Sequence, residues 1–285
     1  MSALRYAAFA LLLSLCTLIP EAHAQFTAMK QIESSLLVTG TVDVDASGRV
    51  LGYAVDEPEK LPQGILNMTA GIAPHWRFEA AAKEAQPERL KMRLFFVSRK
   101  VDETSYEVGL RSADFAKADA SLESRLRIDY SKFIRPHYPK LWETAGVTGT
   151  VFLAVRVGRD GRATDVAVRQ TNVETLASQA QLRRLREAAE RSVLAAAAQW
   201  RFLVPTQGPD ADQTQWVGQV PIEFSFERAP PDYGKWRPYV AGPYVPVPWM
   251  EEDARSADQG PEALSPGALH STTDSRRLIS PLQGG

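Results

Sequence analysis

The feature that most constrains this chain is an order of local signals that occurs twice along it. A Gly-Thr-Val start, an alternating run, a turn containing glycine and a further run occupy residues 40–55 and again residues 149–169. A helical segment follows each time and ends in Trp-Arg-Phe, at residues 76–78 and 200–202. Alternation around a glycine turn predicts a β-hairpin, because glycine accepts the positive φ that such turns require. The repetition therefore predicts two units of similar design.

The second helical segment carries an apolar stripe. Residues spaced by three or four positions lie on one face of an α-helix, and the stripe consists of Leu182, Leu185, Ala189, Val193, Ala196 and Trp200. Each unit then closes with an alternating apolar strand, at residues 90–97 and 217–226. We therefore expect an α+β fold of two small domains, each an antiparallel sheet of about three strands packed against one helix.

The first 24 residues resemble a secretory signal peptide. Arg5 provides the positive start, residues 7–19 form an apolar run, Pro20 interrupts it, and the Ala-His-Ala at 22–24 fits a cleavage site. The run of 13 apolar residues is shorter than the roughly 20 that a membrane-spanning helix needs. We expect cleavage before Gln25 and a periplasmic protein. The alternative is an uncleaved segment that anchors the chain on the periplasmic side of the inner membrane.

These signals divide the chain into five segments. They are the signal peptide (1–24), a degenerate first domain (25–98), a linker (99–135), a second domain (136–228) and a tail rich in proline and aromatic residues (229–285). Within them we expect a shorter helix around Leu61 to Ala73 and a strand at Tyr106 to Leu110. The tail favours an extended, polyproline-like chain that folds back over its own domain. After Met250 its few bulky apolar residues predict disorder.

Composition and motifs argue against several classes of function. The 33 basic and 34 acidic residues nearly balance, whereas nucleic-acid-binding proteins carry an excess of Lys and Arg. The only cysteine, Cys16, lies in the segment expected to be removed. The later histidines, His75, His137 and His270, have no metal-ligand spacing, and the sequence contains no phosphate-binding loop or serine elbow. We therefore predict a protein that is not an enzyme and has no catalytic residue, cofactor, metal or nucleic-acid partner.

Residues 130–228 contain a series of motifs in a fixed order: the Tyr-Pro at 138–139, the strand 151–157, the Asp-Gly turn at 160–161, the helix end at 198–202, Pro205, Gly208 and the strand 220–224. In order and approximate spacing these motifs resemble the C-terminal domain of TonB energy transducers. Residues 36–98 look like a degenerate second copy that lacks the Tyr-Pro entry. The resemblance implies a periplasmic domain that adds an extended segment of an outer-membrane receptor as a strand at the edge of its sheet.

Pro221 indicates where such an edge lies. Proline cannot donate to a β-ladder, so it confines the strand 217–226 to an edge, or to a register in which its nitrogen faces outward. Such an edge is either offered to a partner or guarded against unwanted pairing. If it is offered, the predicted partner-binding residues are Val217, Gln219, Val220, Pro221, Ile222, Phe224 and Phe226.

The departures from the family shape the functional prediction. An energy transducer has an uncleaved membrane helix and a long proline-rich spacer before this domain, and neither is evident in this sequence. We therefore predict a periplasmic TonB-like protein that binds extended segments of envelope proteins, with TonB-dependent outer-membrane receptors as partners. Two alternatives stay open. One is a structural cell-envelope or cell-wall module that self-associates through the same edges, and the other is a membrane-anchored energy transducer, which alone would contact the membrane.

Overall fold

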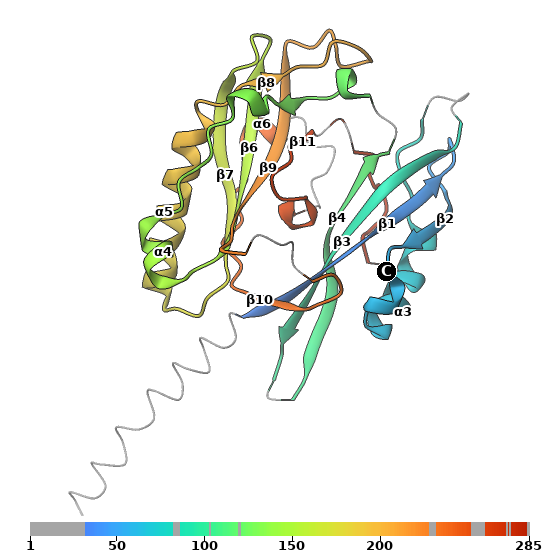
Figure 1. Ribbon diagram of the computed structural model, residues 1–285. Coiled ribbons are helices and arrows are strands. Elements are labelled where there is room, and N and C mark those ends of the chain that lie inside the picture. The colour runs from blue at the N-terminus through green and yellow to red at the C-terminus, as the bar shows by residue number, and fades with distance from the viewer. Residues whose placement is uncertain are drawn as a thin grey trace, which may run out of the picture.

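The computed structural model describes residues 32–81, 86–102, 104–118, 121–227, 232–251, 260–271, 273 and 275–283. The expected signal peptide and the cleavage site before Gln25 lie outside the described residues. Within them, antiparallel strands form two main sheets, and each sheet has a helix packed against one face. Figure 1 shows these layers, with helices α5 and α3 on the outside and the sheets between them. The fold is α+β, as the sequence predicts.

The first sheet combines the N-terminal part of the chain with one strand of the tail. Its order is β10-β1-β3-β4, and β2 pairs with the second half of β1. Alternate residues of β1 and β3, such as Val38 and Leu94, are buried together with Ile65 of α3. The elements are β1 (Glu33–Val44), β2 (Val50–Val55), α3 (Gln63–Ile72), β3 (Glu88–Lys100), β4 (Tyr106–Lys117) and β10 (Arg237–Tyr239), with short 3-10 helices at Pro58–Lys60 and Ala73–His75.

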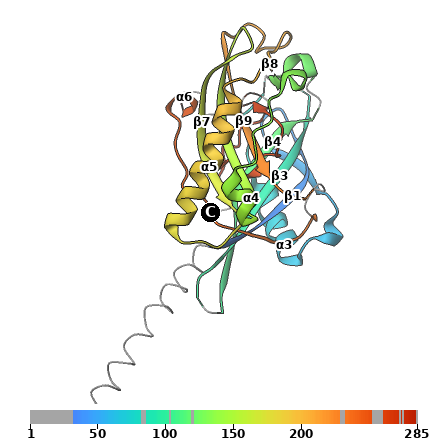
Figure 2. The ribbon, with the colours of Figure 1, turned by 60° about the vertical axis from the view of Figure 1, so that its left-hand side comes forward.

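The second sheet has the order β11-β9-β6-β7. Helix α5 lies across one face of it (Figure 2), and every residue of the predicted stripe is buried. Ser178 and Gln181 form a capping box, which satisfies free amides at the start of α5. The elements are α4 (Lys140–Ala145), β6 (Gly149–Gly158), β7 (Ala163–Val173), α5 (Gln179–Ala197), β9 (Gln215–Phe224) and β11 (His270–Ser271). A separate pair joins β5 (Arg127–Ile128) to β8 (Phe202–Leu203), and the remaining short helices are Leu122–Ser124, Tyr130–Lys132, α6 (Pro248–Glu251) and Pro261–Ala263.

The two hairpins close against the Trp-Arg-Phe motifs in the same way. The amide of Phe78 donates to the carbonyl of Gly48 at 2.8 Å, and the amide of Phe202 donates to the carbonyl of Gly161 at 2.9 Å. Both glycines have positive φ, 85° and 69°. A Cβ at these positions would lie 1.9 Å and 2.4 Å from the phenylalanine carbonyl oxygens. Conformation and close approach therefore both favour glycine at each turn.

Strand β4 lies in the segment where the sequence predicts a linker. It pairs with β3 along its whole length, so the strand expected at its beginning is part of a longer one. Its charged residues have distant partners. The Arg111 guanidinium donates to Glu33 at 2.6 Å, and Asp114 accepts a hydrogen bond from Ser275 at 2.8 Å. Because these partners lie far away in the sequence, the contacts of its charged residues leave no local signal.

The tail packs against both sheets. Residues 232–251, called the strap below, begin at the first sheet, where β10 pairs with β1. The strap continues to the second sheet, where Val240 forms a bridge with Val173. In place of the disorder expected after Met250, the described residues of 260–283 pack on both sheets, and Leu264 and Ser271 are buried. These residues pack on an apolar surface that belongs to the sheets, so the composition of the tail alone does not indicate it.

Candidate functional site

The edge predicted to bind a partner is the side of β9 that faces away from β6, called the outer edge below. β9 pairs with β6 along its whole length, while on the outer edge β11 is the one strand of the described residues that pairs with it, at Gly218 and Gln219. Gly267 also donates its amide to the carbonyl of Pro221 at 2.8 Å. Since the nitrogen and oxygen of a strand residue point to the same side, the Pro221 nitrogen faces the outer edge. The proline therefore removes no hydrogen bond between β9 and β6.

The side chains of the predicted site are mostly buried. Val220, Ile222 and Phe224 belong to the core under α5, and Val217 packs with residues of the strap on the opposite face. Pro221 is also buried. The Gln219 side chain accepts a hydrogen bond from Arg169 at 2.7 Å. Phe226 is 51% exposed. The outer edge thus presents mainly backbone groups to any added strand.

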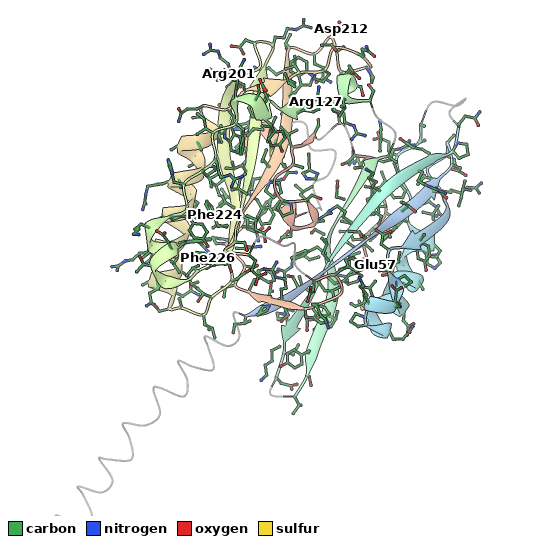
Figure 3. The ribbon with its side chains drawn as sticks, viewed as in Figure 1. Glu57, Arg127, Arg201, Asp212, Phe224 and Phe226 are labelled. Carbon is green, nitrogen blue, oxygen red and sulfur yellow. The ribbon has the colours of Figure 1, made fainter. Side chains whose placement is uncertain are left out.

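Tyr138 extends the apolar surface at the end of β9. Its ring stacks on Phe226 with the centroids 4.7 Å apart and contacts Phe224 edge-on at 5.4 Å. Figure 3 shows both phenylalanines at the end of β9 near α4. The Tyr138 hydroxyl donates to the carbonyl of Val147 at 2.6 Å, and burial raises the pKa of this phenol to about 12. The Tyr-Pro entry is therefore fixed in place beside the exposed ring.

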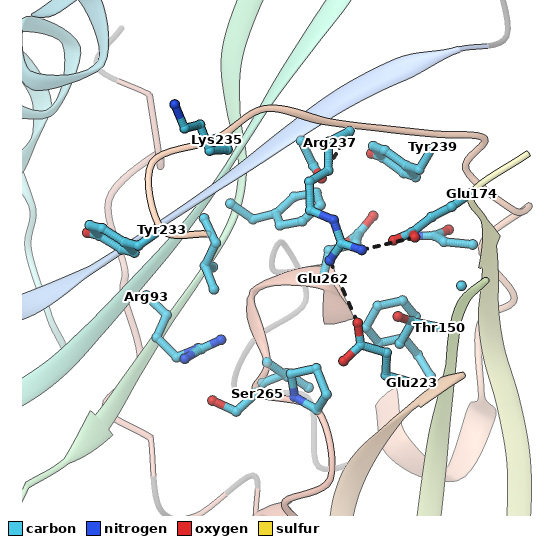
Figure 4. Close-up of a pocket in the computed structure, with 18 of the residues that line it drawn as sticks. Arg93, Thr150, Glu174, Glu223, Tyr233, Lys235, Arg237, Tyr239, Glu262 and Ser265 are labelled. Atoms are coloured by element: carbon cyan, nitrogen blue, oxygen red, sulfur yellow. Dashed lines mark hydrogen bonds and ion pairs between the residues drawn. The ribbon is translucent and has the colours of Figure 1, made fainter. Parts of the chain in front are cut away.

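A pocket of about 440 Å³ lies between the two sheets. Its walls are the sheet faces that point away from the helices, with Phe95 of β3 on one side and Phe152 of β6 on the other. The strap and the turn that follows residues 261–263 complete it. Figure 4 shows that charged side chains from both sheets and the strap point into this space.

Arg237 of the strap connects two carboxylates of the second sheet across this pocket. Its guanidinium lies 3.0 Å from Glu174 and 3.7 Å from Glu223. Burial raises the pKa of Glu223, and the charge of Arg237 opposes this effect. Because Arg237 is the first residue of β10, which pairs with β1, these ion pairs tie the first sheet to the second.

Arg93 of β3 has fewer partners. Its Nε donates to the carbonyl of Ala263 at 2.7 Å. Among the described residues, its terminal nitrogens have no hydrogen-bond or ion-pair partner. Burial lowers the pKa of this guanidinium, and the charge of Asp114 acts in the opposite direction. Figure 4 shows the guanidinium directed into the pocket.

The comparison with protein families decides the identity of the second sheet. Residues 134–226 match the family described as Gram-negative bacterial TonB protein C-terminal. This segment is a TonB C-terminal domain. The TonB domain contains β6, β7, α5 and β9, whereas the first sheet, the strap and β11 lie outside the match. No curated protein and no solved structure matches the chain.

Two kinds of feature are absent from the described part of the chain. No helix there is long and apolar enough to cross a membrane. No group of three or more His, Cys, Asp and Glu side chains there is arranged to hold a metal ion. The pocket is not evident from the sequence, because Arg93, Glu223 and Arg237 come from distant segments and each is an ordinary charged residue in its own strand. No sequence signal links them.

Proposed function

We propose that this chain is an exported TonB-like envelope protein that binds an extended segment of another envelope protein along the outer edge of β9. The observation that carries this proposal is the short neighbour of β9. Among the described residues, the outer edge pairs with the two residues of β11, His270 and Ser271, and accepts one further hydrogen bond from Gly267. Main-chain groups at a sheet edge can pair with an added strand, as in β-augmentation. A partner segment would take the place of β11 and continue toward Phe226.

A TonB domain favours outer-membrane receptors as the source of that segment. Because the side chains of Val220, Ile222 and Phe224 are buried, affinity for the segment would come from backbone hydrogen bonds. Selectivity would then come from the exposed ring of Phe226, which stacks on Tyr138 and offers an apolar surface where the added strand leaves the sheet. This arrangement supports binding of a segment with an apolar residue at that end.

We further infer that the first sheet is a degenerate copy of the TonB domain. Its order β2-β1-β3-β4 parallels the order β7-β6-β9-β11, and the glycine turns of the two units contact Phe78 and Phe202 alike. One difference bears on function. The neighbour of β3 is β4, a strand of 12 residues, whereas the neighbour of β9 has two. Only the second unit would then have an edge suited to strand exchange.

Photo-crosslinking in cells tests the proposed function. A crosslinking amino acid replaces Glu227, which is exposed just beyond β9, and in the matched control it replaces Arg183 on the exposed face of α5. We expect an adduct with an outer-membrane receptor from position 227 and none from position 183. Equal adducts from both positions, or none from position 227, would refute the proposal.

A further inference from the structure

The pocket between the sheets contains a guanidinium whose terminal nitrogens have no hydrogen-bond partner among the described residues. Arg237 has two carboxylate partners, Glu174 and Glu223. Lys235 is exposed at the rim. Arg93 is different, because within the described residues only its Nε has a partner, the carbonyl of Ala263. Its terminal nitrogens are free to bind an anion, and a guanidinium binds a carboxylate through two parallel hydrogen bonds.

The surroundings of Arg93 limit the kind of anion. Leu37, Phe95, Phe152 and Leu264 contribute apolar surface to the walls, so a ligand that fills the pocket needs an apolar body. The volume of about 440 Å³ falls within the range of small-molecule sites, about 300–1,000 Å³. A multiply charged anion would be repelled, because four carboxylates also line the pocket, those of Glu174, Glu223, Asp232 and Glu262. One negative charge and an apolar body fit this combination.

We propose that this pocket binds a small monocarboxylate with an apolar or aromatic body, the carboxylate on the terminal nitrogens of Arg93 and the body between Phe95 and Phe152. The orientation follows from the charges. Glu223 stands on the second sheet, opposite Arg93 of the first, so the carboxylate is favoured at the Arg93 end and disfavoured at the other. The pocket borders the outer edge of β9, since it is lined by Glu223 of β9 and by residues 264–266 before β11, but the proposal does not depend on the function proposed for that edge.

The electrostatics of the pocket agree with this assignment. Burial lowers the pKa of Arg93, since removing water disfavours the charged guanidinium. A bound carboxylate would restore a favourable environment for that charge. Burial raises the pKa of Glu223, which indicates that the opposite end of the pocket does not favour a second negative charge.

Binding of two matched probes to the purified chain tests the proposal. The probes are 3-phenylpropionate and its neutral amide, 3-phenylpropanamide, and the measurement is the dissociation constant by calorimetry or ligand-observed NMR. We expect the wild type to bind the acid about tenfold more tightly than the amide, the gain typical of a hydrogen bond to a charged group. Arg93→Gln should abolish this preference, whereas Lys235→Gln, at the rim of the same pocket, should keep it.

A second variant covers the case in which Arg93→Gln fails to fold. Glu223→Gln removes a negative charge from the pocket and should strengthen binding of the acid severalfold without strengthening binding of the amide. A gain of this kind does not arise from misfolding. No binding of either probe to the wild type, equal binding of both, or an equal loss of preference in Arg93→Gln and Lys235→Gln would overturn the proposal.

Discussion

A proline at position 270 tests whether the tail competes with a partner for the outer edge of β9. Pro221 faces this edge, so Gln219, two residues earlier, faces it as well, and its pair with His270 is of the hydrogen-bonded kind. His270→Pro removes the backbone donor at this position. His270→Ala is the matched control, because it keeps the donor while losing the side-chain contacts to Ser265 and Asp114.

The expected effect follows from the loss of one backbone hydrogen bond. Such a bond contributes about 0.5–1.5 kcal/mol net. A partner that must displace β11 would then bind about 2- to 13-fold more tightly to His270→Pro than to His270→Ala. The two variants differ at one backbone amide, so contacts of the imidazole cancel in the comparison.

The assay is fluorescence anisotropy with a labelled peptide that has the sequence of residues 264–273 and competes with the chain's own copy. Binding to the wild type should be weak, because a tethered segment acts at an effective concentration in the millimolar range. Equal peptide affinities for the proline and alanine variants, with both folded by circular dichroism, would refute the idea that β11 limits access to the edge.

Three further predictions concern stability, each measured by urea denaturation. Gly48→Ala and Gly161→Ala should each destabilise the chain by at least about 1–2 kcal/mol because both glycines have positive φ. Gly71→Ala should instead stabilise it by about 0.5–1 kcal/mol, because Gly71 is exposed in α3 and an added Cβ would meet open space. A loss of stability at Gly71 equal to that at the turns would contradict this. Burial alone would raise the pKa of Glu33, but hydrogen bonds and charge from its Arg111 partner lower this pKa below the ordinary 4.5. The ionised form of Glu33 therefore stabilises the fold above pH 4.5, and this contribution is lost as the pH falls through the lowered pKa. Glu33→Gln should therefore be less stable than wild type at pH 7, with a difference that shrinks below pH 4.5, and a difference independent of pH would count against the ion pair. Trp142→Phe should lower the free energy of unfolding by about 1–3 kcal/mol, because the indole donates a buried hydrogen bond of 2.8 Å to a carbonyl of α5. An unchanged unfolding midpoint would show that this bond contributes nothing to stability.

Local patterns predicted the elements that bury one face. The stripe from Leu182 to Trp200 and the alternation of β6 and β9 each encode which side of the element meets the core, because helices and strands have fixed side-chain periods. The glycine turns and Trp-Arg-Phe motifs were visible for a related reason. A positive φ and a close backbone approach both favour glycine at that position, so the turn can be predicted from the glycine in the sequence.

The tail shows why other elements escaped prediction. The described residues of 260–283 are held by partners on distant segments, such as Asp114 for Ser275, and the charged residues of β4 likewise have distant partners, as Arg111 has in Glu33. The pairing of β11 with β9 likewise involves few residues and little apolar surface of its own. Such segments become ordered only because the sheets present a matching surface. The spacing of apolar residues within the segments does not indicate this.

The sequence by itself therefore determined the α+β class, the hairpins, the helical stripe and the TonB domain, since each depends on short-range periodicity or on residue types restricted by the backbone. Only the tertiary structure decided that the outer edge of β9 carries β11 and that Arg93, Glu223 and Arg237 meet around one pocket. The physical reason is the range of the interactions. Charges and edge hydrogen bonds take whichever partner the fold brings near, so their pairing is fixed after the sheets are assembled.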